Sequence, residues 1–266
     1  MARKIEILGV GVDLVGVEDL HREILAMCRR TREAGEDCHP VLNVNANCLN
    51  LAWSRPWLRD ALNEASLVFC DGAGGALAAR ILGQPVPERI TYADWMWQLA
   101  GFAAREGLSM YLLGAKPGVA EEAARALRRR HPALRISGTA HGYFDKSAGS
   151  AGNEAALGRI ADAGPDILVA GFGMPLQELW ISENRHGLGC GVALAGGAVF
   201  DYVSGRARRG PRFLTGNGLE WLARLAIEPR RLWRRYVIGN PLFLSRVIRA
   251  RLFGTRPPGA EDRRRS

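Results

Sequence analysis

Long apolar runs are missing from this 266-residue chain, and so are the cysteine patterns of common metal sites. The longest uncharged stretch, residues 188–200, falls well short of the ~20 residues that a membrane-spanning helix needs. The five cysteines include no Cys-x-x-Cys pair and no histidine partner at metal-ligand spacing, so we expect reduced, buried thiols and no metal. The first ten residues resemble no signal peptide, because Glu6 interrupts the apolar run and no cleavage site follows, which favours a cytoplasmic protein.

The glycine patterns of the best-known nucleotide sites are also incomplete. Gly9 and Gly11 lack the third glycine of a dinucleotide-binding turn, which leaves an NAD-type nucleotide-binding protein as a weak alternative. The loop at 114–118 is not a Walker loop, because no Gly-Lys-Ser/Thr follows at the required spacing. Its backbone at Gly114 and Lys116 could still hold a phosphate at a helix start, although a simple turn explains the loop equally well.

Positive charge is concentrated at one end of the chain. Residues 206–266 hold 16 arginines, no lysine and four acidic residues, whereas the remainder is slightly acidic in a chain of net charge +9. Trp and Phe alternate with Arg at near-helical spacing there, a pattern typical of helices that lie on anionic membranes. An ordinary helical lobe with a solvated basic face is the alternative, and a non-catalytic nucleic-acid-binding protein is a weaker one, because no recognised RNA- or DNA-binding signature accompanies the charge.

Short apolar runs alternate with helical patterns along the chain. This alternation predicts an α/β fold with a largely parallel sheet and flanking helices. Domain boundaries are expected to give a catalytic core at 1–204 (one domain or two lobes), a basic helical appendage at 205–255 and a disordered tail at 256–266. The expected strands are 5–8, 41–44, 67–69, 110–113, 134–137, 167–170 and 192–195, and the expected helices include 17–34, 56–64, 92–106, 119–130, 153–163 and 176–184.

Asp71 is the most informative single residue. It follows an apolar run that predicts a buried strand, and open α/β sheets bind ligands at the carboxyl ends of their strands. Gly72, Gly74 and Gly75 lack side chains that would obstruct another group, and an acid in such a place can act as a general base. Arg89 could hold a leaving phosphate beside it, although a structural salt bridge explains the pair equally well.

Other polar groups follow the remaining predicted strands. Asn43, Asn45 and Asn47 offer donors and acceptors suited to sugar hydroxyls, or alternatively they form turns and helix caps. Gly171 and Gly173 precede a predicted helix whose first turn contains Gln177. Two polar-aromatic loops, containing Tyr143 and Asp201, could hold a base and a ribose or could serve packing.

Taken together, these segments resemble the WecG/TagA/CpsF family of bacterial glycosyltransferases. The resemblance rests on eight stretches in order, from position 43 to about 244. They are Asn-x-Asn at 43–45, Ala-Ser-Leu-Val-Phe-Cys-Asp-Gly at 65–72, Pro-Glu-Arg at 87–89, Tyr-Leu-Leu-Gly-Ala-Lys-Pro-Gly at 111–118, His-Gly-Tyr-Phe at 141–144, Gly-Phe-Gly-Met-Pro-Leu-Gln-Glu at 171–178, Ala-Gly-Gly-Ala-Val-Phe-Asp at 195–201, and Gly-Leu-Glu-Trp-Leu-Ala-Arg-Leu at 218–225 with the arginine-rich run at 228–236.

The resemblance implies a Rossmann-like core of the GT-E type and an inverting transferase without metal or cofactor. Such an enzyme moves a sugar from a UDP donor to a polyprenyl-diphosphate-linked sugar at the inner membrane face, as a peripheral membrane protein. It also implies roles for residues. Asp71 would be the general base, Arg89 would steady the diphosphate, Asn45 and Gln177 would position substrates, Tyr143 and Asp201 would lie near uracil and ribose, and Arg224, Arg231 and Arg234 of the appendage would close over the site. A homo-oligomer is compatible with this assignment.

Two differences from the family pattern concern the donor sugar. Many members have Thr in place of Asn43 and an acid in place of Asn47, and the segment at 89–94 differs from the usual Val-Ala-Gly or Val-Pro-Gly after the arginine. Both lie near the expected sugar pocket. A hexose or uronic acid donor is therefore an alternative to N-acetylmannosamine.

Overall fold

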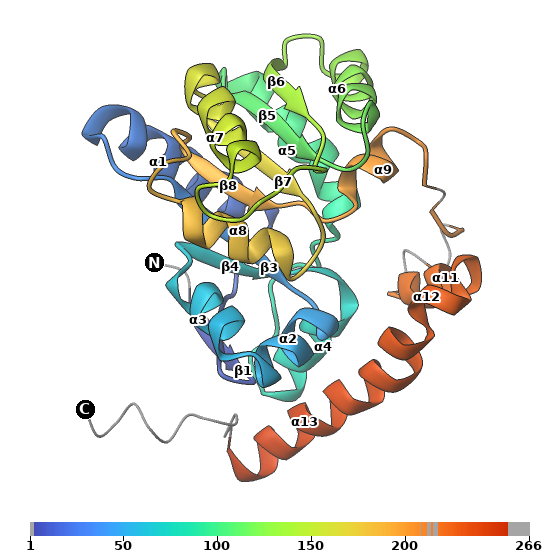
Figure 1. Ribbon diagram of the computed structural model, residues 1–266. Coiled ribbons are helices and arrows are strands. Elements are labelled where there is room, and N and C mark those ends of the chain that lie inside the picture. The colour runs from blue at the N-terminus through green and yellow to red at the C-terminus, as the bar shows by residue number, and fades with distance from the viewer. Residues whose placement is uncertain (1–2, 208, 212–213, 215–217, 255–266) are drawn as a thin grey trace. The chain divides into compact units, whose positions relative to one another are not determined.

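The computed structural model describes residues 3–207, 209–211, 214 and 218–254 (Figure 1). The expected tail at 256–266 lies outside these residues. The chain divides into two units. Unit 1 comprises Met1–Gly16, Asn43–Ile90 and Arg208–Ser266, and unit 2 comprises Val17–Leu42 and Thr91–Ala207. One six-stranded sheet has the order β4-β3-β8-β7-β5-β6, in which β3 (His39–Val44) contributes residues to both units.

Unit 2 is an α/β unit built on the parallel strands beyond β3. The strands β5, β7 and β8 are buried along their whole lengths, as expected for parallel strands covered on both faces, whereas the edge strand β6 is partly exposed. Its core includes Trp95 and Trp180. The strands are β5 (Ser109–Gly114), β6 (Arg135–Ala140), β7 (Ile167–Gly171) and β8 (Val192–Ala195), and the helices are α1 (Val17–Ala34), α5 (Tyr92–Glu106), α6 (Val119–Arg130), α7 (Ala151–Ala163), α8 (Leu176–Asn184) and α9 (Val199–Val203).

Unit 1 combines three segments that are distant in sequence. The hairpin of β1 (Lys4–Ile7) and β2 (Val10–Asp13) is joined to β4 (Leu67–Cys70) by Asp13, whose carboxylate accepts a hydrogen bond from the Val68 amide at 2.9 Å. Helices α2 (Ala46–Ser54), α3 (Pro56–Glu64) and α4 (Gly72–Ile81) complete this part. The C-terminal segment adds α11 (Glu220–Ile227), α12 (Pro229–Trp233), the π-helix η1 (Arg234–Ile238) and α13 (Gly239–Phe253), and α13 packs on α2 and α4.

The predicted α/β class with a parallel sheet and a helical C-terminal appendage is confirmed. Five of the six predicted helices have the predicted limits, and the sixth, α7, begins two residues earlier, at Ala151. All seven predicted strands are present, β8 with the predicted limits and the other six with shifted ends, and β2, α2, α4 and α9 were not predicted. The expectation of reduced, buried thiols also holds, because all five cysteines are free and buried. Within the described ranges, every helix is too short or too polar to cross a membrane, and no group of acidic, histidine or cysteine side chains is arranged to hold a metal ion.

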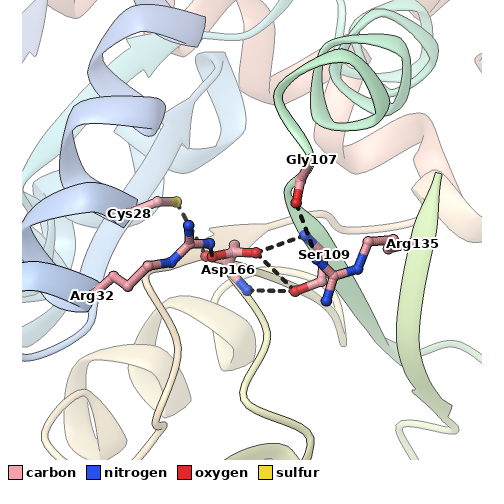
Figure 2. A network of polar contacts seen from close by, with 6 residues as sticks. All are labelled: Cys28, Arg32, Gly107, Ser109, Arg135 and Asp166. Carbon is pink, nitrogen blue, oxygen red and sulfur yellow. Dashed lines mark hydrogen bonds and ion pairs between the residues drawn. The ribbon is translucent and has the colours of Figure 1, made fainter. Parts of the chain in front are cut away.

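A polar network lies at the amino ends of β5 and β7 (Figure 2). The Asp166 carboxylate accepts hydrogen bonds from the backbone N–H and the hydroxyl of Ser109, at 2.7 and 2.9 Å, and it also pairs with Arg32 of α1. The Asp166 backbone carbonyl accepts a hydrogen bond from the Cys28 thiol, and the Asp166 backbone N–H donates to the Ser109 hydroxyl. Both oxygens of this carboxylate are therefore occupied in joining α1 to two strands. Its place at the amino edge, away from the loops that follow the strands, indicates a structural junction.

Candidate active site

Asp71 lies where β4 ends and α4 begins. Its backbone N–H donates to the Val44 carbonyl of β3 at 2.8 Å, and the next N–H, of Gly72, donates to Ile90 at 2.7 Å. Asp71 and Ile90 also form an isolated parallel bridge. The half-buried Asp71 is thus fixed by main-chain bonds on both sides, and its side chain does not cap α4. This places a carboxylate at the carboxyl edge of the sheet, as predicted.

The asparagines divide into different roles. Asn45 caps α2, since its side-chain oxygen accepts from the backbone N–H groups of Asn47 and Cys48, each at 3.1 Å. The cap interpretation of the sequence is thereby confirmed for Asn45, and Asn47 lies in the first turn of the helix. Asn43 is only 4% exposed, and its side-chain oxygen has no hydrogen-bond partner among the described residues. An unsatisfied acceptor of this kind is costly unless a ligand or water supplies the donor.

The first turns of α2 and α4 lie against each other. A Cβ added at Gly74 would lie 3.1 Å from the Ala46 Cβ, and one at Gly75 would lie 2.9 Å from the Cys70 sulfur. Gly74 and Gly75 therefore do let other groups approach closely, as predicted, and these groups are the Ala46 and Cys70 side chains of the protein itself. Gly72 differs, because it has φ +76° and a Cβ added there would meet no described atom within 4 Å. Two helix starts beside Asp71 concentrate partial positive charge, which favours an anion, although Asn45 already accepts from two N–H groups of α2.

Arg89 belongs to the same group of residues. It is exposed and precedes Ile90, the bridge partner of Asp71. A Cβ at Gly218 would lie 3.0 Å from an Arg89 guanidinium nitrogen and 2.9 Å from the Ala73 Cβ. The backbone that leads into α11 therefore touches both Arg89 and the first turn of α4. Unit 1 thus brings Asp71, Arg89 and the start of the appendage together, although nothing in the sequence spacing required it.

The appendage arginines have different surroundings. Arg231 is exposed and forms a two-point ion pair with Glu228, at 2.7 and 3.0 Å. Such an exposed pair contributes little, about 0–1 kcal/mol, so it can open at low cost when a phosphate competes. The Arg234 guanidinium lies 5.4 Å from the centre of the Trp233 ring, and Arg224 is half-buried in α11. A direct role of these three arginines in substrate binding stays a prediction.

In unit 2 the loops after β5, β6 and β7 are interlocked through the main chain. The Ala115 N–H donates to the Gly171 carbonyl, and the Gly142 N–H donates to the Ala115 carbonyl. Gly114 cannot be replaced by another residue unless the backbone moves, because an added Cβ would lie 2.4 Å from the Gly171 carbonyl oxygen. The glycines here permit backbone to pack on backbone at the carboxyl edge of the sheet. The exposed Lys116 follows in the turn before α6.

Gln177 joins the loops after β7 and β8. Its side-chain oxygen accepts from the N–H groups of Gly173 and Gly197, at 3.1 and 2.8 Å, and its side-chain nitrogen donates to Glu178 at 2.9 Å. The residue is buried at 1% exposure. The structure therefore gives Gln177 a positioning role for two glycine loops, and its contact with a substrate stays a prediction.

The two expected base and ribose residues also lie after strands of unit 2. Tyr143 follows β6, is 65% exposed and donates its N–H to the His141 ring at 3.2 Å, so its ring is available for stacking. Asp201 lies half-buried in α9, and its carbonyl accepts from Ala207 at 2.8 Å. Both positions agree with a site at the carboxyl edge of the sheet, and the ligand that each contacts stays a prediction.

Glu178 was not recognised from the sequence. It is fully buried, and one of its carboxylate oxygens has no partner among the described residues. Burial raises the pKa of Glu178 to about 7, against a smaller lowering by its hydrogen bond to Gln177. The available signal was its spacing of three residues from the buried Ile181, which places it on the inner face of α8.

We expect Glu178 to make stability depend on pH. A carboxyl group with a raised folded-state pKa stabilises the fold fully below its unfolded pKa of about 4.5, and that contribution is lost as pH rises through about 7. The loss should reach about 3 kcal/mol by pH 8. Urea unfolding between pH 5 and 8 should show this fall in the wild type and a flatter profile in Glu178→Gln. The exposed Glu183→Gln on the same helix is the matched control, and an unchanged slope in Glu178→Gln would contradict the assignment.

Comparison with known proteins identifies the family to which these arrangements belong. Residues 5–257 match the glycosyl transferase WecG/TagA/CpsF family. The chain belongs to this glycosyltransferase family. Two relatives carry the name N-acetylglucosaminyldiphosphoundecaprenol N-acetyl-beta-D-mannosaminyltransferase. The one from Staphylococcus aureus (strain NCTC 8325 / PS 47) is 28% identical over 244 residues, or 90% of this chain and 93% of the relative. The one from Bacillus spizizenii is 29% identical over 206 residues, or 77% of each chain.

Membership of the WecG/TagA/CpsF family confirms the resemblance drawn from the eight sequence stretches. It makes this chain a glycosyltransferase, an enzyme that transfers a sugar. The match covers the appendage as well as the sheet, so the C-terminal helices are part of the family's domain.

Proposed function

We propose that this glycosyltransferase moves a sugar from a UDP donor to a sugar on a polyprenyl diphosphate, with inversion and without a metal ion. The observation that carries the proposal is the fixed position of Asp71 at the end of β4, between the end of β3 and the segment of Arg89. The Staphylococcus and Bacillus relatives are named for transfer onto N-acetylglucosaminyldiphosphoundecaprenol, which supports the lipid-linked acceptor.

In this mechanism Asp71 removes the proton from the attacking hydroxyl of the acceptor. The oxygen then attacks the anomeric carbon of the donor in a single displacement, the bond to the UDP oxygen breaks, and UDP leaves with both bonding electrons. One displacement inverts the anomeric configuration. Arg89 and the starts of α2 and α4 supply positive charge for the departing diphosphate, the role that a metal ion has in other transferases.

The remaining polar groups have assigned tasks within their own units. The unsatisfied oxygen of Asn43, in β3, accepts a hydrogen bond from a sugar hydroxyl or amide, and Asn47 lies in the first turn of the following helix, α2. We assign nucleotide binding to unit 2, where Tyr143 stacks on uracil, Asp201 binds the ribose, and the loops containing Gly114, Gly171 and Gly173 approach the nucleotide. Lys116 adds positive charge at that edge. The donor is N-acetylmannosamine, as in the relatives' names, or a hexose or uronic acid, as the differences at positions 43 and 47 favour.

The exposed side of the appendage is the part that we assign to the membrane. We define the appendage surface as the exposed residues Trp233, Val237, Ile238, Leu242, Ile248, Leu252 and Phe253 with Arg230, Arg234, Arg249 and Arg251. Helix α13 buries Phe243 and Val247 on its inner side yet carries apolar side chains on its outer side too. Apolar groups flanked by arginines suit an anionic lipid surface. The enzyme would then act as a peripheral protein on the cytoplasmic face.

A donor screen tests the transfer. With a short-chain N-acetylglucosaminyl diphosphoprenol acceptor and EDTA present, we expect UDP release that requires both the acceptor and one of the UDP sugars. N-acetylmannosamine, hexose and uronic acid donors should be compared at equal concentration. Calorimetry with UDP, NAD and a short RNA distinguishes the transferase from an NAD-type nucleotide-binding protein and from a nucleic-acid-binding protein. If none of the UDP sugars gave UDP release, and the protein bound NAD or RNA in place of UDP, the proposal would be contradicted.

A further inference from the structure

Arg246 differs from the other arginines of α13, because it faces inward. Its guanidinium donates to the side-chain oxygen of Asn50 in α2 at 2.8 Å and lies 5.4 Å from the centre of the Trp53 ring. Arg249 and Arg251, on the same helix, are exposed, whereas Arg246 and Trp53 are half-buried. A charge-assisted hydrogen bond combined with a cation–π contact is a specific attachment, and both partners come from one helix.

Asn50 holds α13 at two places. Its side-chain nitrogen donates to the Gly239 carbonyl at the start of α13, at 2.8 Å, while its oxygen accepts from Arg246. These two residues are about two helical turns apart. Between them, Phe243 and Val247 are buried on the inner side of α13. Asn50 is therefore a polar anchor in an otherwise apolar contact, and no apolar substitution could replace both of its bonds.

The anchored helix leads directly to the candidate active site. Asn50 lies one turn after Asn47, and Asn45 caps the same nine-residue helix through the N–H groups of Asn47 and Cys48. Helix α13 also packs on α4, which begins immediately after Asp71. One helix thus contacts both helices whose first turns border the candidate site. Short helices move nearly as rigid bodies, so a change in how α13 is held would reach the Asn45 cap.

We propose that Asn50 and Arg246 are positioning residues that transmit membrane docking of α13 to the Asn45 cap at the start of α2. The inference rests on the proposed membrane role of the appendage surface. Lipid contact on the outer side of α13 favours the arrangement in which its inner side is fully packed. A surface can shift such an equilibrium only if it binds one arrangement better than the other, and the outer apolar side chains provide that difference.

Hydrogen exchange at the Asn47 and Cys48 amides tests the coupling, because both rest on the Asn45 cap. With vesicles of phosphatidylglycerol and phosphatidylethanolamine, the full chain should gain at least about fivefold protection there, the lower end of usual coupling between sites. Arg246→Ala should bind the vesicles in a sedimentation assay but lose this gain. Arg246→Lys keeps the charge without the planar fork and should recover part of it, which also covers a folding failure of the alanine variant.

The matched control is Arg130→Ala in unit 2, because Arg130 lies over Trp97 at the same 5.4 Å and contacts neither α2 nor α13 in any described interaction. It should respond to vesicles as the wild type does. A wild type that binds vesicles without added protection, or an Arg246→Ala variant that keeps the gain, would overturn the coupling alone. A wild type that does not bind vesicles would overturn both the coupling and the membrane role, whereas sugar transfer is judged separately by UDP release with the short-chain acceptor.

Discussion

Asp71→Asn is expected to fold as the wild type does and to lose about 10²–10⁴-fold in turnover, the usual contribution of a general base. The amide keeps the size of the side chain but cannot accept the proton from the acceptor hydroxyl. Since the backbone of Asp71 is held by the Val44 carbonyl and, through Gly72, by Ile90, the substitution leaves these main-chain bonds intact. Steady-state UDP release should show the loss in kcat, with little change in donor KM.

The helix that precedes the same strand supplies the control for Asp71. Glu64 is an exposed acid at the end of α3, just before β4, whereas Asp71 follows that strand. Glu64→Gln removes one negative charge from the same unit at the amino side and should keep wild-type turnover. Full activity in Asp71→Asn would remove Asp71 from the mechanism. An equal loss in both variants would point to net charge in place of proton transfer.

The sequence predicted helices and strands well where the apolar residues followed one clear pattern, either a continuous run or a helical repeat. The continuous apolar runs of β5, β7 and β8 and the amphipathic pattern of α1 follow local rules, and their limits were predicted nearly as observed. The carboxyl-edge position of Asp71 followed from the same rules, because a strand that ends in an acid needs no tertiary information to be noticed.

The helices that were missed are those whose sequences serve distant contacts. Helix α4 contains three glycines in its first four residues, and each costs about 1 kcal/mol relative to alanine in a helix interior. Glycine suits positions 74 and 75 because an added Cβ would lie 3.1 Å from the Ala46 Cβ or 2.9 Å from the Cys70 sulfur, so a neighbour would have to move. In α2 the polar Asn50 breaks the apolar pattern because it binds α13, about 190 residues later. Local propensity cannot reveal a residue whose reason lies in another segment.

Local sequence rules also could not predict which segments of the chain form unit 1. It joins segments from the start, the first third and the end of the chain, so the expected division into a core at 1–204 and an appendage at 205–255 follows the sequence order more closely than the contacts do. Arg89 and Gly218 illustrate this, since they lie side by side although 129 positions separate them. The site was therefore predictable from the strand ends, whereas its connection to the appendage was expected only from the family resemblance and not from local sequence rules.

Ile248→Glu with Leu252→Glu is expected to weaken binding to anionic vesicles by about tenfold per residue. These side chains are 44% and 67% exposed, one turn apart on the outer side of α13, so lipid contact would bury much of what water now covers. Burial of a whole Leu or Ile side chain contributes about 1.5–3 kcal/mol, and about 1.4 kcal/mol corresponds to tenfold in affinity. Vesicle sedimentation at low salt measures the loss, and high salt should weaken the wild type as well.

Leu77→Glu is the matched control, because Leu77 is a 48% exposed leucine of α4 outside the appendage surface. It should bind vesicles as the wild type does, and undiminished binding by the double variant would show that the appendage surface is not the docking face. Point variants test this better than deletion of everything after Gly216, a residue outside those described. Deletion would uncover the side of α2 and α4 on which Phe243 and Val247 pack, and it would remove the bonds of Asn50 to α13. A truncated enzyme could therefore fail through a disturbed Asn45 cap even if the membrane played no part, whereas glutamates on the outer side leave those contacts in place and report on the lipid surface alone.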